Sequence, residues 1–138
     1  MLVSTIMSRQ LITIRPDDTV EVAARLMAHH NIGAMPVCTT DGKLKGIITD
    51  RDLTIRALAD EVPKGTKVKN VMSKGIVSVD AHADVKEALE LMAQHKVRRL
   101  PVTSSGSIIG MISLGDISKS SNLNIEAGKA LKDISEKE

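Results

Sequence analysis

Two short stretches of the sequence carry a hydroxyl and, three residues later, a carboxylate. They are GIITDRD at residues 46–52, with Thr49 and Asp52, and GMISLGD at residues 110–116, with Ser113 and Asp116. A hydroxyl can bond a phosphate oxygen, and one carboxylate can accept two hydrogen bonds from vicinal hydroxyls such as those of ribose. The combination would therefore suit a ribose phosphate. The structural alternative is a helix cap, because a Ser or Thr followed by an acid at this spacing stabilises any helix start.

Two more features of these stretches bear on that choice. Each has a glycine, Gly46 or Gly110, at the same position before the hydroxyl. Each also joins a predicted strand to a predicted helix, where unpaired backbone N–H groups and the helix dipole favour an anion. Because the whole combination occurs twice, we favour a ligand site over a simple cap. In the first stretch, Arg51 could reach a phosphate or be solvated, and Asp50 with Asp52 could hold a magnesium ion carried by ATP.

The two stretches belong to an internal repeat that fills residues 1–119. Matching segments are Met7-Ser8 and Met72-Ser73, LMA at 26–28 and 91–93, and MPV at 35–37 with LPV at 100–102. Such self-similarity indicates two copies of one supersecondary unit. Neither copy alone, at about 60 residues, would bury much core, so we expect the two copies to pack as a pseudo-two-fold pair.

Each copy is predicted to be an α/β (α+β) unit with the element order β-α-β-β-α. Apolar residues at helical spacing predict the first helix of each copy: Val20, Ala23, Ala24 and Met27, then Val85, Ala88, Leu89 and Met92. The other expected features are first strands at 11–14 and 76–79, turns at 41–43 and 105–107, and second helices from near Asp50 and Leu114. We expect Asp17 or Asp18 to cap the first helix.

The predicted domain organisation follows the repeat. The first domain spans 1–62, a linker spans 63–67, the second domain spans 68–120, and a tail helix at 121–138 completes the chain. The tail is mostly polar with a few apolar residues, so we expect it to dock on the pair or on a second subunit. Gly128 weakens a helix there by about 1 kcal/mol relative to Ala.

Length and composition exclude several classes of protein. The chain has 138 residues, 42% hydrophobic and 26% charged, which is typical of a soluble globular protein. A net charge of +2 is too small to indicate nucleic-acid binding, and the absence of Phe, Trp and Tyr removes the rings on which single-strand modules stack bases. Cys38 is the only cysteine, and no apolar run has the length of a signal peptide or a membrane span. We therefore expect a cytoplasmic protein.

The repeat resembles tandem CBS domains, the pair called a Bateman module. The resemblance covers residues 1–119 and rests on the pattern H-x-[IV]-x-x-[ML]-P-V, at 30–37 and 95–102, and on the two stretches that carry the hydroxyl and the carboxylate. In that family the two domains meet through their sheets, and two clefts between them often hold adenosyl ligands. The resemblance therefore implies AMP, ADP, ATP with magnesium, S-adenosylmethionine or NAD as the ligand, and no obligatory cofactor.

The resemblance also implies roles for individual residues. Asp52 and Asp116 resemble the acids that bind ribose, and Thr49 and Ser113 resemble the hydroxyls that face phosphate. Thr13 and Ser78 resemble residues near the base or ribose, and Arg98 and Arg99 resemble the cations that contact phosphate. The first copy departs from the pattern, because Gly33 and Ala34 stand where the second copy has its arginines. Only the second copy is therefore expected to offer this positive charge to a phosphate.

The favoured function is a sensor, in which an adenine nucleotide binds between the halves and shifts an interface that a partner protein reads. The alternative is a non-catalytic interaction scaffold whose clefts are vestigial. We expect no enzyme, because the sequence has no Ser-His-Asp arrangement, no glycine-rich P-loop and no paired His and carboxylate. His29 and His82 lack metal-ligand spacing, so we expect no metal site. Each copy repeats an apolar helix stripe, which predicts a homodimer formed helix face to helix face.

Overall fold

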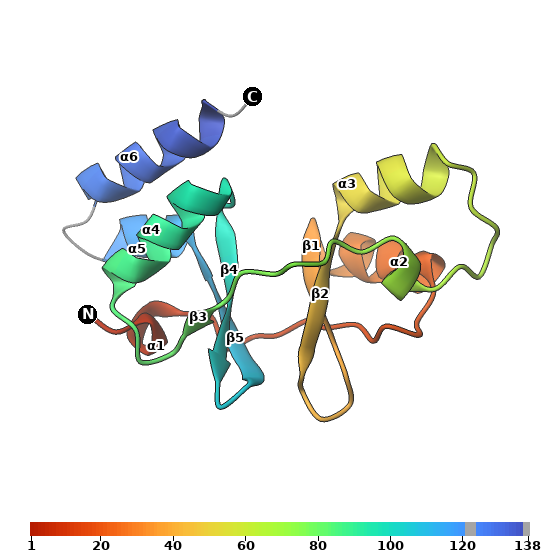
Figure 1. Ribbon diagram of the computed structural model, residues 1–138, viewed down its shortest axis with the longest axis horizontal. Coiled ribbons are helices and arrows are strands. Elements are labelled where there is room, and N and C mark those ends of the chain that lie inside the picture. Colours follow the sequence, from red (N-terminus) through yellow and green to blue (C-terminus); the bar gives the residue numbers. More distant parts are fainter. Residues whose placement is uncertain (121–123, 137–138) are drawn as a thin grey trace. The chain divides into compact units, whose positions relative to one another are not determined.

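The computed structural model describes residues 1–120 and 124–136. These residues form two compact units, which are coloured by sequence in Figure 1. Unit 2 is Ile12–Ile76, and unit 1 combines Met1–Leu11 with Val77–Glu138. The two ends of the predicted tail, 121–123 and 137–138, lie outside the described residues.

Unit 2 has a two-stranded sheet with a helix on either side of it in the sequence. Its elements are α2 (Val20–His30), β1 (Ala34–Cys38), β2 (Leu44–Thr49), α3 (Asp50–Asp52), the π-helical segment η1 (Leu53–Leu58) and the 3-10 turn η2 (Val68–Asn70). Strands β1 and β2 are antiparallel, and Ile14 pairs in parallel with Val37 on the other side of β1. The core is aliphatic and includes Met27, Met35 and Ile48.

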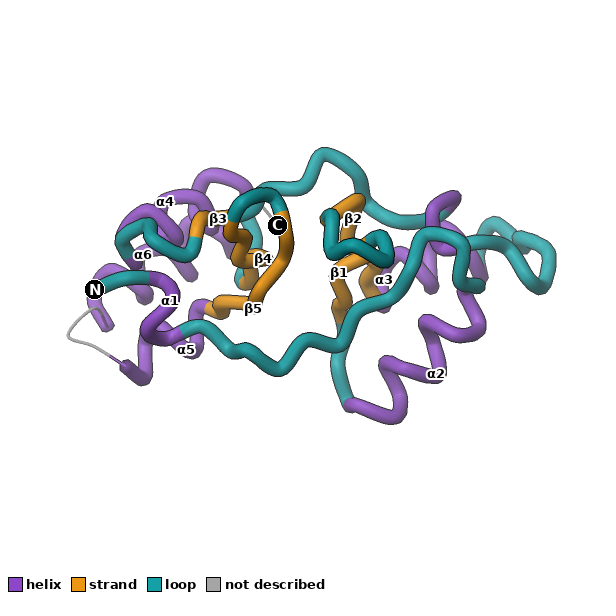
Figure 2. The backbone as a smooth tube through the Cα atoms, turned by 90° about the horizontal axis from the view of Figure 1, so that it is seen from below, coloured by secondary structure: helices purple, strands orange, loops and turns teal. Residues whose placement is uncertain are grey.

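Unit 1 repeats this plan with a third strand and additional helices. Its elements are α1 (Val3–Ile6), β3 (Val79–Asp80), α4 (Val85–His95), β4 (Arg99–Ser104), β5 (Ser107–Ser113), α5 (Leu114–Ser120) and α6 (Asn124–Ser135). The sheet order is β3-β4-β5, with β3 parallel and β5 antiparallel to the central β4. Figure 2 shows α4 and α5 on one face of this sheet.

The sheet of each unit is completed by a Met-Ser segment that belongs to the other copy of the repeat. In unit 1, Ser8 exchanges two backbone hydrogen bonds with Met111, at 2.7 and 2.9 Å. In unit 2, Ser73 does the same with Ile47, at 3.1 and 2.9 Å. The compact units therefore cut across the sequence repeat, since residues 1–11 pack with the second repeat.

This packing explains the glycines that precede each hydroxyl. A Cβ atom on Gly110 would lie 2.7 Å from the carbonyl oxygen of Ser8, and one on Gly46 would lie 2.6 Å from the sulfur of Met72. Both distances are too short for real contacts, so only glycine lets the Met-Ser segment lie on the strand. The repeated glycine has a packing role, and it does not favour a ligand site as we inferred from the sequence.

The structure confirms both amphipathic helices and corrects one predicted cap. The N-cap of α2 is Thr19, whose hydroxyl accepts a hydrogen bond from the Val22 N–H at 3.3 Å. Asp18 accepts the Arg15 N–H instead, and Asp17 lies against two lysines. Prediction of the cap at Asp17 or Asp18 was therefore wrong, because these acids are used in the turn before the helix.

The predicted first strands are shorter than expected. Of the strand expected at 76–79, only Val79 belongs to a strand, β3 (Val79–Asp80). Of the strand expected at 11–14, only Ile14 pairs with a neighbouring strand. The ladder in unit 2 ends quickly because Pro16 has no N–H to donate. The second helices begin at Asp50 and Leu114, as predicted. The turns also form, with positive φ at Gly42, Ser105 and Gly106.

Helix α6 belongs to unit 1, where it packs against α4 and α5. Its buried residues Ala127, Ala130 and Ile134 join the same core cluster as Leu89 and Ile117. Figure 1 shows α6 above α4 in that unit.

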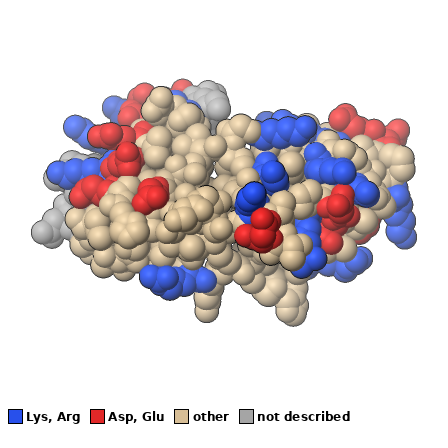
Figure 3. Space-filling view, turned by 60° about the horizontal axis from the view of Figure 1, so that its bottom comes forward, with Lys and Arg blue, Asp and Glu red and all other residues tan. Residues whose placement is uncertain are grey.

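The surface carries charges of both signs. On the face drawn in Figure 3, basic and acidic side chains lie near one another rather than in areas of a single sign. Within the described part of the chain, no helix is long and apolar enough to cross a membrane.

Candidate ligand site

The hydroxyl and carboxylate of unit 2 form a closed capping box. Thr49 is the N-cap of α3, and its hydroxyl accepts the Asp52 N–H at 3.0 Å. In return, the Asp52 carboxylate accepts the Thr49 N–H at 3.0 Å. The same carboxylate also accepts the Ser73 hydroxyl, and the Arg56 side chain lies 3.8 Å from it. Asp52 is only 6% exposed, so its acceptor capacity is largely used by the protein.

The hydroxyl and carboxylate of unit 1 form the same box with fewer additional partners. The Ser113 hydroxyl accepts the Asp116 N–H, and the Asp116 carboxylate accepts the Ser113 N–H, both at 3.0 Å. Asp116 is half-buried, and among the described residues its second carboxylate oxygen accepts no hydrogen bond. The structural alternative considered from the sequence is thus present in both units, and only in unit 1 does the carboxylate keep an oxygen for a further donor.

The arginines predicted to contact phosphate lie beside this box. Arg99 is the strand partner of Ser113, and the Arg98 carbonyl accepts the Leu114 N–H at 2.9 Å. Both arginine side chains are exposed and form no ion pair with a described carboxylate. They line a pocket of about 450 Å³ whose other lining residues are Ser113, Leu114, Gly115, Ser118, Ala127, Gly128 and Leu131. None of these lining residues is acidic.

At the equivalent place, unit 2 carries an acidic side chain near its glycine. The Asp50 N–H donates to the Gly33 carbonyl at 2.9 Å, and Ala34 is the strand partner of Thr49. The Asp50 carboxylate lies near Gly33 and accepts the N–H of Arg51 at 2.8 Å. The negative side chain of Asp50 therefore occupies the region that in unit 1 carries positive charge.

The remaining predicted residues are less closely associated with these boxes. Arg51 is exposed, and Thr13 is exposed beside the single bridge at Ile14. Ser78 is half-buried directly before β3. Neither Thr13 nor Ser78 lines the pocket that contains the arginines.

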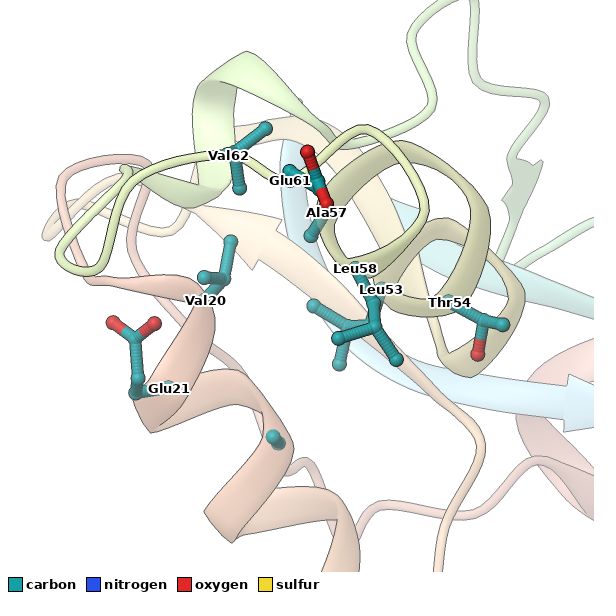
Figure 4. A pocket seen from close by; sticks show the side chains of 9 residues that line it. Val20, Glu21, Leu53, Thr54, Ala57, Leu58, Glu61 and Val62 are labelled. Atoms are coloured by element: carbon teal, nitrogen blue, oxygen red, sulfur yellow. The ribbon is translucent and has the colours of Figure 1, made fainter.

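A second pocket, of about 630 Å³, lies between α2 and η1 in unit 2. It is mostly apolar, and Figure 4 shows the side chains that line it: Val20, Glu21, Ala24, Leu53, Thr54, Ala57, Leu58, Glu61 and Val62. Leu58 is 76% exposed and Ile55 is 45% exposed on the same helix. The equivalent face of unit 1, formed by α4 and α5, is covered by α6. Unit 2 thus presents an open apolar helix face.

Metal-binding and redox groups are few. Within the described residues, no three His, Cys, Asp or Glu side chains gather closely enough to hold a metal ion. Cys38 is a free, buried thiol, and burial raises its pKa above the ordinary value. The thiolate is the reactive form of cysteine, and burial disfavours it. We therefore interpret Cys38 as a core residue and not as a redox group.

The sequence reasoning missed two contributors to these sites. The first is Ser73, whose hydroxyl donates to the Asp52 carboxylate. The repetition of Met-Ser at 7–8 and 72–73 is the sequence signal that could have indicated it. Helix α6 supplies Ala127, Gly128 and Leu131 to the arginine pocket, and because α6 is not part of the repeat, no repeat comparison could have placed it there.

Comparison with known proteins identifies similar chains and structures. The family model of the CBS domain matches residues 3–58 and 68–122. The CBS domain-containing protein YhcV of Bacillus subtilis is 41% identical over 129 residues, which cover 94% of this chain and 91% of that protein.

Two solved structures are similar over most of this chain. The crystal structure of Hypoxic Response Protein I with two coordinated zinc ions has a TM-score of 0.81 at 33% identity, covering 88% of this chain and 99% of that one. The CBS domain pair of protein MJ0100, in complex with 5′-methylthioadenosine and S-adenosyl-L-methionine, has a TM-score of 0.76 at 26% identity, covering 94% and 98%.

Proposed function

Since this chain belongs to the CBS-domain family and contains two CBS repeats, we propose that it is a non-catalytic regulatory module that binds an adenosyl ligand. Support comes from the CBS pair of MJ0100, a similar structure that holds two adenosyl compounds. The single observation that carries the proposal in this chain is the box of Ser113 and Asp116 beside two arginines that pair with no described carboxylate.

Each part of that box suits one part of a nucleotide. The carboxylate of Asp116 keeps an oxygen for the vicinal hydroxyls of a ribose. Arg98 and Arg99 offer planar donors that match a phosphate, and no described carboxylate forms an ion pair with them. The proposed site is therefore the one in unit 1. In unit 2, Asp52 is occupied by protein donors and Asp50 is negative, so we propose weaker binding or none there.

Among adenosyl ligands, we propose AMP, ADP or ATP as the preferred class. A ligand with phosphate would use both the Asp116 carboxylate and the arginines, whereas S-adenosylmethionine offers the arginines one carboxylate together with two positive groups. NAD carries phosphate and ribose but is much larger. Magnesium would enter only together with ATP, since the described residues include no metal-binding cluster.

We further propose that the protein is a homodimer and that the open face of unit 2 forms the interface. The side chain of Leu58 is 76% exposed there, beside an apolar pocket between α2 and η1. Exposed apolar patches of this kind mark interaction sites. A second copy would cover this face as α6 covers the α4–α5 face of unit 1.

The second candidate function is a scaffold that binds partner proteins without a ligand. The observation that favours it is the pair of closed capping boxes, each of which stabilises its helix without any ligand. The two functions differ in one property, because only a sensor changes its stability when a nucleotide is added.

A thermal-shift screen separates these two functions. The screen uses AMP, ADP, ATP with magnesium, S-adenosylmethionine and NAD at millimolar concentration. A ligand present at 100 times its dissociation constant raises the free energy of unfolding by about 2.7 kcal/mol. The sensor predicts a higher melting temperature with at least one adenine nucleotide. If none of these compounds changes the melting temperature, the scaffold is the better description.

A further inference from the structure

One wall of the arginine pocket is the C-terminal helix. The pocket is bounded by the start of β4, the junction of β5 and α5, and three residues of α6: Ala127, Gly128 and Leu131. Gly128 has no atom within 4 Å of the position where a side chain would begin, so the pocket is open at this point. A molecule held by the arginines would therefore lie against α6.

Helix α6 is held in place by apolar contacts and by a hydrogen bond from unit 1. Ala127, Ala130 and Ile134 are buried against unit 1, and the Lys96 side chain donates a hydrogen bond to the Asp133 carbonyl at 2.6 Å. Leu131, in contrast, is 41% exposed although it faces the pocket. Alanines bury little apolar area, so contacts with a bound ligand would add to the docking of α6.

The charge of the pocket fixes the chemistry of its ligand. Arg98 and Arg99 form no ion pair with a described carboxylate, and the lining residues whose side chains the structure describes include no Asp or Glu. The carboxylate of Asp116 accepts the N–H of the lining residue Ser113. Two uncompensated guanidinium groups beside apolar helix atoms favour a compact polyanion such as a di- or triphosphate group.

We infer that α6 is part of the ligand site, and that a phosphate-bearing ligand in this pocket holds α6 against α4 and α5. The ligand would lie against both the arginines and α6, so its binding favours the docked position of the helix over the detached one. This inference rests on the proposed function for the identity of the site, and it adds the tail helix as the element that responds. Unit 2 has no counterpart, because it lacks both the arginines and a covering helix.

The test combines hydrogen exchange with a substitution that fills the pocket. In the full chain, ATP or inorganic triphosphate should slow amide exchange in α6 while leaving α2 unchanged. Gly128→Leu should weaken both compounds by about tenfold, because a side chain there occupies the space of the ligand. Ser135→Leu is the matched control, since it adds the same side chain to an exposed position of α6 outside the pocket lining.

The outcomes separate this inference from the proposed function. If ATP binds but α6 exchange does not change and Gly128→Leu binds normally, the inference is overturned and the adenosyl site stands. If triphosphate protects α6 while no adenosyl compound shifts the melting temperature, the inference stands and the proposed function fails. If neither ATP nor triphosphate binds, the inference is overturned, and the proposed function fails as well only if no other adenosyl compound shifts the melting temperature. Circular dichroism of Gly128→Leu and of the smaller Gly128→Ala checks that a loss of binding is not a loss of fold.

Discussion

The hydroxyl of Ser73 lies 3.2 Å from both carboxylate oxygens of Asp52, and no equivalent contact reaches Asp116 among the described residues. Ser8, which matches Ser73 in the repeat, pairs with Met111 through its backbone only. The two acids at matching positions of the repeat therefore have different structural roles. Asp52 joins a helix start to the Met-Ser segment, whereas Asp116 keeps an oxygen for another donor.

The first prediction concerns stability. Asp52→Ala removes a buried acceptor from the Thr49 N–H and the Ser73 hydroxyl, so it should cost about 1–3 kcal/mol of unfolding free energy. Asp116→Ala removes only the capping box and should cost about 1 kcal/mol. Urea denaturation of both variants without ligand measures the difference. Equal losses would contradict the distinction between the two acids.

The second prediction concerns the glycines under the Met-Ser segments. Gly46→Ala and Gly110→Ala place a Cβ atom within 3 Å of the segment and should each destabilise the protein by about 1–3 kcal/mol. Gly128→Ala is the matched control, because a Cβ atom at that position has no atom within 4 Å. This variant should stabilise α6 by up to about 1 kcal/mol. If the first two variants unfold at the same urea concentration as the wild type, the close approach is not a constraint.

The third prediction is a pH dependence that arises at Asp84, the N-cap of α4. Its pKa is lowered, first by the Lys86 N–H that it accepts and then by the N-terminal ammonium group. A lowered pKa means that the stability it contributes is present above the pKa of the unfolded chain and is lost as pH falls through the folded value. Asp84→Asn keeps a capping acceptor but does not titrate.

Urea denaturation at several pH values between neutral and 3 tests this prediction. The wild type should lose stability relative to Asp84→Asn as the solution becomes acidic. Above the pKa of Asp84 in the unfolded chain, the difference in unfolding free energy between the two proteins should no longer change with pH. A stability difference between the two proteins that stays constant across the whole pH range would contradict the assigned role of Asp84.

The fourth prediction concerns the dimer. Leu58→Glu places a charge on the open helix face of unit 2, where it should separate the two subunits without affecting the core, because Leu58 is exposed. Light scattering should show a dimer for the wild type and a monomer for the variant at micromolar concentration. Lys119→Glu, an exposed position on α5 in unit 1, is the control and should remain dimeric. A wild type that is monomeric would remove the proposed interface.

The repeat made most of the fold predictable. Periodic apolar residues located α2 and α4, and the turn sequences located both hairpins, because these signals are local. The exchange of Met-Ser segments is a long-range contact, and periodicity carries no information about it. Its trace was the pair Gly46 and Gly110, which we attributed to a ligand rather than to packing.

The capping box was predictable as the structural alternative, whereas its environment was not. The spacing of Ser113 and Asp116 indicated their mutual bonds, and the structure contains them. That Asp52 is saturated by Ser73, and that α6 lies against the arginine pocket, depends on tertiary contacts between distant segments. Roles for Thr13 and Ser78 stay predictions, because no described contact connects either residue with the pocket.

The most direct test of the central claim is calorimetry of AMP and adenosine binding to the wild type and to Arg99→Ala. If a phosphate lies against the unit 1 arginines, Arg99→Ala should weaken AMP about tenfold or more and leave adenosine nearly unchanged. Arg25→Ala, an exposed arginine on α2 outside both pockets, is the matched control and should not affect either ligand. Equal losses for AMP and adenosine in Arg99→Ala, or no binding by the wild type, would contradict the claim.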